Sequence, residues 1–195
     1  MDELNALSLR VFEYLGSLPT VSNVDYKPSP GIQGHNVALW EQRHKPKILP
    51  HDLVEFLTMS NGLSVKWYTM LKGKQHLVGH FSLNSLQQLK DMNAVFPDGT
   101  HLALALHSSI TIEQPEIWLH DTMSNWVFLA STFTDYYRMM IVHLGLIGWQ
   151  NLYTSVGLDP LTKQWFYLFV PGRVRQLPLN SKAAETPKIA ILPFL

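Results

Sequence analysis

The chain has no cysteine among its 195 residues. A disulfide framework, a thiol nucleophile and a cysteine-based zinc site are therefore excluded. Charged residues are also scarce, at 15% of the chain, against roughly 25% in an average domain. Fifteen basic residues balance fifteen acidic ones, and without a basic excess neither nucleic acid nor a membrane surface is an expected partner.

Long apolar runs are missing as well. The longest nearly apolar stretch, residues 139–149, is interrupted by His143 and has about half the length of a membrane-spanning helix. The chain begins with Met1-Asp2-Glu3, which is acidic where a secretion signal is basic. We therefore expect a soluble, cytoplasmic protein.

Apolar side chains make up 46% of the sequence, which is enough for one sizeable core. The length is close to that of a single domain of about 150 residues. We expect one domain over residues 1–170. Residues 171–195 contain four prolines and no periodicity, so they are predicted to form an extended C-terminal tail.

Hydrophobic periodicity predicts an α+β fold with a mostly antiparallel sheet of about four to five strands, packed against N-terminal and C-terminal helices. Helices are expected near residues 4–18, 50–60, 133–144, 149–156 and 160–169, with Asn61-Gly62 as the left-handed cap of the second one. Hairpins are expected at residues 63–81 and 116–130. Strict alternation over residues 101–107 predicts a central strand.

Residues that could carry chemistry do not form a recognisable catalytic or metal site. His76 and His80 have the spacing of paired metal ligands on a helix, but they fall in a predicted strand, where they would lie about 13 Å apart. No serine occupies a G-x-S-x-G turn, and Gly73-Lys74 lacks the upstream glycine of a phosphate-binding loop. We expect no catalytic residue, no metal and no cofactor.

Aromatic residues are dense between residues 136 and 169, and many of them are expected in the core. The helix near residues 160–169 has a predicted buried stripe of Leu161, Trp165 and Leu168, with further aromatic residues beside it. A helix that is apolar nearly all round is either wholly buried or part of an interface. The candidate partner-binding residues are Tyr136, Tyr137, Arg138, Trp149, Phe166 and Tyr167. The Lys66 and Tyr68 side of the first hairpin is the alternative surface.

Two groups of residues resemble known families. Leu49-Pro50-x-Asp52-Leu53-x-x-Phe56-Leu57 and Asn61-Gly62, followed by an aromatic strand, are similar to the opening signature of the SUKH superfamily. Residues 116–166 resemble the family of tubulin polyglutamylase complex subunit 2, most specifically in Phe133-Thr134-x-Tyr136-Tyr137-Arg138 and Lys163-Gln164-Trp165-Phe166. The fold-signature residues are Leu49, Pro50, Asp52, Asn61, Gly62 and Trp67.

The resemblance implies a SUKH-like domain that serves as a non-catalytic scaffold in a complex adding glutamates to tubulin tails. A separate tubulin-tyrosine-ligase-like subunit would perform the ligation. The implied partners are the other subunits and, indirectly, tubulin and microtubules. The implied location is the cytoskeleton, at the centrosome or ciliary base. Members of this family usually have a longer region before the Glu-Ile-Trp strand and a long basic tail, and both are reduced here.

Two alternative interpretations remain open. A stand-alone SUKH-type adapter would bind an unrelated protein partner, and a small enzyme would act by an unrecognised mechanism. The search for catalytic residues disfavours the enzyme, and the motif at residues 163–166 disfavours the unrelated adapter.

Overall fold

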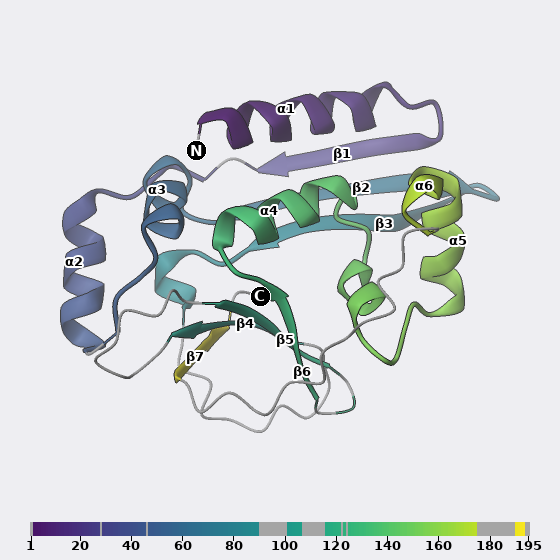
Figure 1. Ribbon diagram of the computed structural model, residues 1–195. Coiled ribbons are helices and arrows are strands. Elements are labelled where there is room, and N and C mark those ends of the chain that lie inside the picture. Colours follow the sequence, from purple (N-terminus) through teal and green to yellow (C-terminus); the bar gives the residue numbers. More distant parts are fainter. Residues whose placement is uncertain are drawn as a thin grey trace.

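The structure is a computed structural model. It describes residues 2–27, 29–45, 47–89, 101–106, 116–121, 123, 125–174 and 190–193. Residue 2, residues 101–106 and 190–193 and the last two of α6 are described by their backbone alone. In chain order (Figure 1) the elements are α1 (Asp2–Ser17), β1 (Val21–Lys27), α2 (Gly34–Arg43), α3 (His51–Met59), β2 (Leu63–Leu71), β3 (Lys74–Leu83), η1 (Leu86–Gln88), β4 (His101–Leu106), β5 (Glu116–His120), β6 (Trp126–Ala130), α4 (Phe133–Val142), η2 (Trp149–Tyr153), α5 (Pro160–Phe169), α6 (Pro171–Val174) and β7 (Ala190–Pro193).

The strands form two antiparallel sheets. The first has the order β1-β2-β3 and the second the order β6-β5-β4-β7. The α+β class and the antiparallel pairing are confirmed, whereas the single predicted sheet is divided in two. Strand β4 lies inside the second sheet, as its alternation predicted.

The C-terminal segment contains regular structure where an extended tail was predicted. Residues 171–174 form the short helix α6, and β7 pairs with β4 in the second sheet. Residues 175–189 lie outside the described residues. The domain boundary after residue 170 and membership of the SUKH superfamily stay predictions.

Strand β2 follows the predicted alternation and forms the middle of the first sheet. Leu63, Val65, Trp67 and Thr69 are buried, whereas Leu71 is exposed because it reaches the tip of the hairpin. The turn to β3 places Lys72 at φ +49° and Gly73 at φ +73°. Two positive φ values are typical of a two-residue turn whose twist matches that of the flanking strands.

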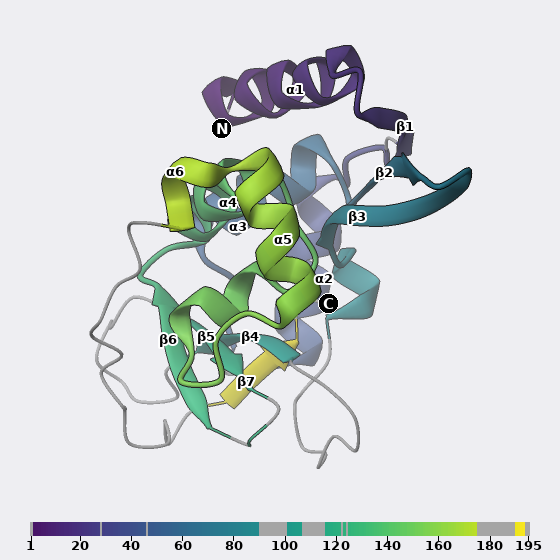
Figure 2. The same ribbon diagram turned by 90° about the vertical axis from the view of Figure 1, so that its right-hand side faces the viewer.

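Helix α1 lies on the same face of the first sheet as α4 (Figures 1 and 2). The Phe12 ring packs against the rings of Tyr26 on β1 and Phe81 on β3, with centroids 5.6 and 5.0 Å apart. Leu7 and Tyr14 of this helix are exposed. The buried side of α1 consists of Leu4, Ser8, Phe12 and Leu15.

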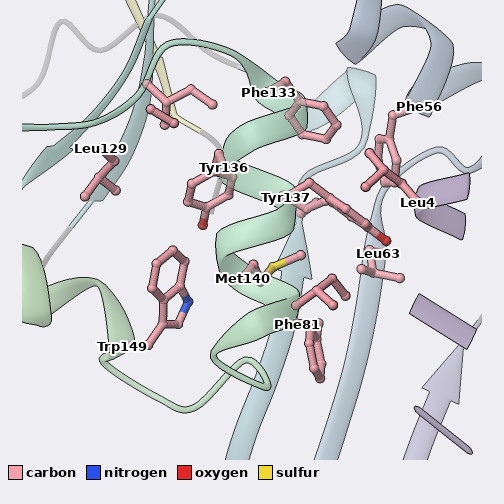
Figure 3. Packing of buried hydrophobic residues seen from close by; sticks show 14 of the residues in the cluster. Leu4, Phe56, Leu63, Phe81, Leu129, Phe133, Tyr136, Tyr137, Met140 and Trp149 are labelled. Atoms are coloured by element: carbon pink, nitrogen blue, oxygen red, sulfur yellow. The ribbon is translucent and has the colours of Figure 1, made fainter. Parts of the chain in front are cut away.

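Helix α4 lies between the two sheets and packs against β5, β6, α1 and α3 (Figure 1). The buried hydroxyls of Tyr137 and Ser8 are 2.9 Å apart and join α4 to α1. Figure 3 shows Tyr136 on the side of Leu129 and Trp149, whereas Tyr137 points toward Phe56. The buried residues of α4 are Phe133, Tyr136, Tyr137, Met140 and Ile141.

Most of the fold-signature residues form contacts that hold the elements together. Asp52, in the first turn of α3, accepts hydrogen bonds from the backbone N–H of Leu53 (2.9 Å) and from that of Thr134 (2.8 Å), so one carboxylate serves the first turns of both α3 and α4. The Asn61 side chain accepts a hydrogen bond from the backbone N–H of Leu86 at 2.9 Å. Side chains that satisfy otherwise unpaired N–H groups stabilise helix starts.

Trp67 joins β2 to the end of α4. Its indole N–H donates to the carbonyl of Leu144 at 2.8 Å, and its side chain is fully buried. Leu49 is buried, and Pro50 precedes the first residue of α3. The signature residues Asp52, Asn61 and Trp67 therefore contribute contacts that stabilise the fold.

Gly62 has the predicted left-handed conformation, with φ +97°. Helix α3 nevertheless ends at Met59, so Gly62 lies beyond the helix cap at Ser60, at the entry to β2. A Cβ atom at position 62 would lie 2.9 Å from the carbonyl oxygen of Leu83. Both the φ angle and the crowding favour glycine at this position.

We expect Gly62→Asn to destabilise the protein by about 1 to 3 kcal/mol, because a side chain at this position meets backbone atoms. The matched control is Gly73→Asn, which also has a positive φ but nothing within 4 Å of an added Cβ. Asparagine tolerates that conformation, so the control should change stability by less than about 0.5 kcal/mol. Urea unfolding of both variants measures the difference, and equal losses would show that crowding at position 62 is unimportant.

Candidate interaction surface

The described residues offer little that could perform catalysis. Within them, no group of three or more His, Asp or Glu side chains could hold a metal ion, and no helix combines the length and apolar character that a membrane span needs. His76 and His80 lie on strand β3, as predicted from the period. Burial and the neighbouring Lys66 lower the pKa of His80.

Four of the six candidate partner-binding residues lie in the core and not on the surface. Tyr136, Tyr137, Trp149 and Phe166 have exposed fractions of 1, 4, 2 and 0%. Burial raises the pKa of both tyrosine hydroxyls, so they stay protonated at neutral pH. The period of α4 showed which residues share a stripe, but it could not show that a sheet lies on each side of the helix.

Aromatic residues after α4 form a cluster inside the protein. The ring of His143 stacks on Trp149 with a centroid distance of 4.9 Å, and it lies 6.0 Å from the rings of Tyr153 and Phe166. His143 also contacts the carbonyl of Met139 through Nδ1 at 2.7 Å. This cluster fixes α5 against the end of α4 and η2.

Helix α5 has the bounds that the sequence predicted, Pro160–Phe169. Asp159 caps it by accepting hydrogen bonds from the backbone N–H groups of Leu161 (3.0 Å) and Thr162 (3.1 Å), and Pro160 occupies the first helical position. Hydrogen bonding to Thr162 holds the pKa of Asp159 below its usual value. The Thr162 hydroxyl donates to the carbonyl of Ile147 at 3.1 Å, which ties α5 to the connection after α4.

The buried side of α5 differs from the predicted one. Thr162 and Phe166 are buried, and Phe169 packs edge-on against Trp67 with a centroid distance of 4.8 Å. Leu161 and Leu168, both predicted to be buried, have exposed fractions of 58 and 57%. The helix has two apolar stripes with the same spacing, and periodicity alone cannot tell which of them faces the core.

We call Leu161, Trp165, Tyr167 and Leu168 the outer α5 surface. Trp165 is half-buried and lies between the two exposed leucines at helical spacing, and Tyr167 is 55% exposed. Three large apolar side chains are thus exposed on a helix of ten residues. Only Tyr167 of these four was among the candidate residues, because the leucines and Trp165 were assigned to the core.

Arg138 is the other candidate residue that lies on the surface. Its guanidinium is 3.6 Å from the carboxylate of Asp135, one turn earlier on α4, and both side chains are more than half exposed. Exposed pairs of this kind contribute little to stability. Arg138 is therefore available for contact with a partner.

A cleft of about 390 Å³ lies beside the first turn of α5. His80 and Ser82 of β3, Leu119 of β5, Asn151 and Asp159 contribute to its walls. The Asp159 carboxylate is already engaged by the backbone of α5, so it is not free to act as a base toward a bound molecule. The His80 ring in the wall of the cleft also has a partner, because its Nε2 lies 3.4 Å from the hydroxyl of Ser64.

Three curated proteins are similar to this chain. The human protein is 28% identical over 86% of this chain and 70% of its own length. The rat and mouse proteins are 28% and 27% identical, each over 86% of this chain and 72% of its own length. Each is named tubulin polyglutamylase complex subunit 2, which confirms the resemblance seen in residues 116–166. No protein-family model matches the chain, and no solved structure matches it.

We expect the two sides of α5 to respond differently to substitution. Phe166→Ala should reduce the free energy of unfolding by about 3 to 5 kcal/mol, because it empties a buried site. Leu161→Ser and Leu168→Ser should each change it by less than about 0.5 kcal/mol, as is usual for exposed positions. Urea unfolding followed by circular dichroism distinguishes them. A loss of several kcal/mol in either serine variant would place the outer α5 surface in the core.

Proposed function

We propose that this chain is a non-catalytic scaffold subunit of a tubulin polyglutamylase complex. The observation that carries the proposal is its similarity to three proteins with that subunit name over 86% of the chain. A separate subunit, resembling tubulin tyrosine ligase, would bind ATP and attach glutamate to tubulin. The complex would act at the cytoskeleton, including the centrosome or ciliary base.

The hydrogen bonds of three aspartates support a non-catalytic subunit. Phosphoryl transfer from ATP requires carboxylates that hold magnesium and cations that hold phosphates. In the described part of the chain, Asp52, Asp121 and Asp159 each accept two backbone hydrogen bonds within 3.1 Å, so they stabilise turns and helix starts. The folding contacts of these residues account for their presence.

The outer α5 surface and Arg138 are the proposed sites of contact with other subunits. Tyr, Trp and Arg are enriched at the centres of protein interfaces, where loss of one anchor can cost about 2 kcal/mol or more. Tyr167, Trp165 and Arg138 supply these three residue types on the outside of the molecule. Burial of the two exposed leucines in an interface would remove further apolar surface from water.

We expect the isolated chain to add no glutamate to tubulin. Purified protein would be incubated with microtubules, ATP, magnesium and radiolabelled glutamate, beside the assembled complex as the positive control. Tubulin should incorporate the radiolabelled glutamate only when the assembled complex is present. Incorporation that depends on this chain alone would contradict a non-catalytic role.

We expect Tyr167→Ala combined with Leu168→Ser to reduce co-purification of the other subunits at least about fivefold, because an interface anchor and its apolar neighbour are lost. Arg138→Ala should have a smaller effect in the same direction. The matched control is Tyr14→Ala on α1, whose side chain is 52% exposed. All variants should melt within a few degrees of the wild type. Full retention of partners by the stable double variant would exclude the outer α5 surface from the interface.

A further inference from the structure

The β2–β3 hairpin carries charge of one sign in a chain whose charges balance. It contains Lys66, Lys72 and Lys74 together with His76 and His80, and residues 56–90 include no aspartate or glutamate. The nearest acidic partner across the sheet is Asp25, which pairs in register with Lys66 at the inner part of β2. The two lysines near the turn have no acidic neighbour on either hairpin strand.

The outer part of the hairpin projects from the body of the molecule (Figure 2). Strand β1 pairs with β2 only as far as Thr69, so the hairpin is two-stranded beyond that residue. Met70, Leu71 and Leu77 are 54, 49 and 39% exposed. Exposed aliphatic residues and two lysines therefore lie close together around the turn, with Met70 and Leu71 in the two-stranded part and Leu77 opposite Tyr68 beside it.

The outer edge of β3 is open next to this projecting part. Within the described residues, the connection after α4 pairs with β3 at two points. The N–H of His80 donates to the carbonyl of Gly145 (2.7 Å), and the N–H of Ile147 donates to the carbonyl of Val78 (3.1 Å). Among the strands that the structure describes, none pairs with that edge at residues 74–77. An open strand edge offers backbone donors and acceptors to an extended peptide.

We infer that the outer β2–β3 hairpin binds an extended acidic peptide segment, which adds as a strand along the edge of β3 at residues 74–77. The peptide carboxylates would pair with the ammonium groups of Lys72 and Lys74. Apolar side chains of the peptide would contact Met70, Leu71 and Leu77. This inference does not depend on the proposed complex, because it follows from the charge, exposure and open edge of the hairpin.

Two other anionic partners fit the hairpin less well. Single-stranded nucleic acid is bound by stacking on aromatic rings, and residues 70–77 contain no Phe, Tyr or Trp. Insertion into an anionic membrane would bury Lys72 and Gly73 first, because the turn lies beyond the aliphatic residues. An acidic peptide uses both the lysines and the open edge of β3.

The test measures binding of a fluorescent glutamate-rich peptide by anisotropy, with the full chain. Binding at low salt should weaken at least about fivefold when ionic strength is raised beyond about 0.3 M, since exposed charges are then screened. The double variant Lys72→Asn/Lys74→Gln should bind at least about fivefold more weakly than the wild type. Asparagine suits the positive φ of the turn at position 72, so a thermal melt should show that the fold is retained.

The matched control is Arg10→Gln/Lys45→Gln, which removes two exposed cations from other parts of the surface and should bind like the wild type. A peptide of equal charge with proline at alternate positions cannot form the strand ladder and should bind at least about threefold more weakly. The inference is overturned by any of four results: no binding at low salt, equal losses in both double variants, equal affinity for the proline peptide, or tighter binding to a single-stranded oligonucleotide or to phosphatidylserine vesicles.

Discussion

The fold depends on the burial of α4 between two sheets. Each part of this helix is held by a different element: its first turn by the carboxylate of Asp52, its middle by the contact between Tyr137 and Ser8, and the carbonyl of Leu144 just after it by Trp67. Burial of each large apolar side chain contributes about 1.5 to 3 kcal/mol. Five such side chains on one helix of ten residues make α4 the element that joins the sheets to α1 and α3.

The position of α4 also determines which side of α5 is exposed. After α4 the chain turns through Leu144 and Gly145, both at positive φ, and then pairs with the edge of β3. The aromatic cluster that follows takes Phe166 into the core. The opposite side of α5, with Leu161, Tyr167 and Leu168, is left on the surface. The exposed apolar residues are thus a consequence of the packing that stabilises the domain.

Local patterns in the sequence predicted the elements in which one face is buried and the other is exposed. The alternation of β2, the stripe of α4 and the cap of α5 at Asp159 follow from residue spacing alone. Strand β1 and helix α2 were not predicted. The strand carries mostly polar residues, as an edge strand can, and the helix begins with Gly34, a residue with low helix propensity. Both are held by tertiary contacts, Tyr26 against Phe12 and the buried side chains Val37 and Trp40. The choice between the two stripes of α5 required knowledge of the residues against which this helix packs, Trp67 of β2 and His143 after α4, which periodicity does not contain.

The outer α5 surface is the proposed contact with another subunit, and site-specific photo-cross-linking tests this contact directly. A benzophenone amino acid would replace Leu168 in the assembled complex, with the same replacement of Tyr14 on α1 as the control position. We expect irradiation to join this chain to another subunit from position 168 and much less from position 14. Cross-links from position 14 alone, or only within this chain from position 168, would contradict the claim.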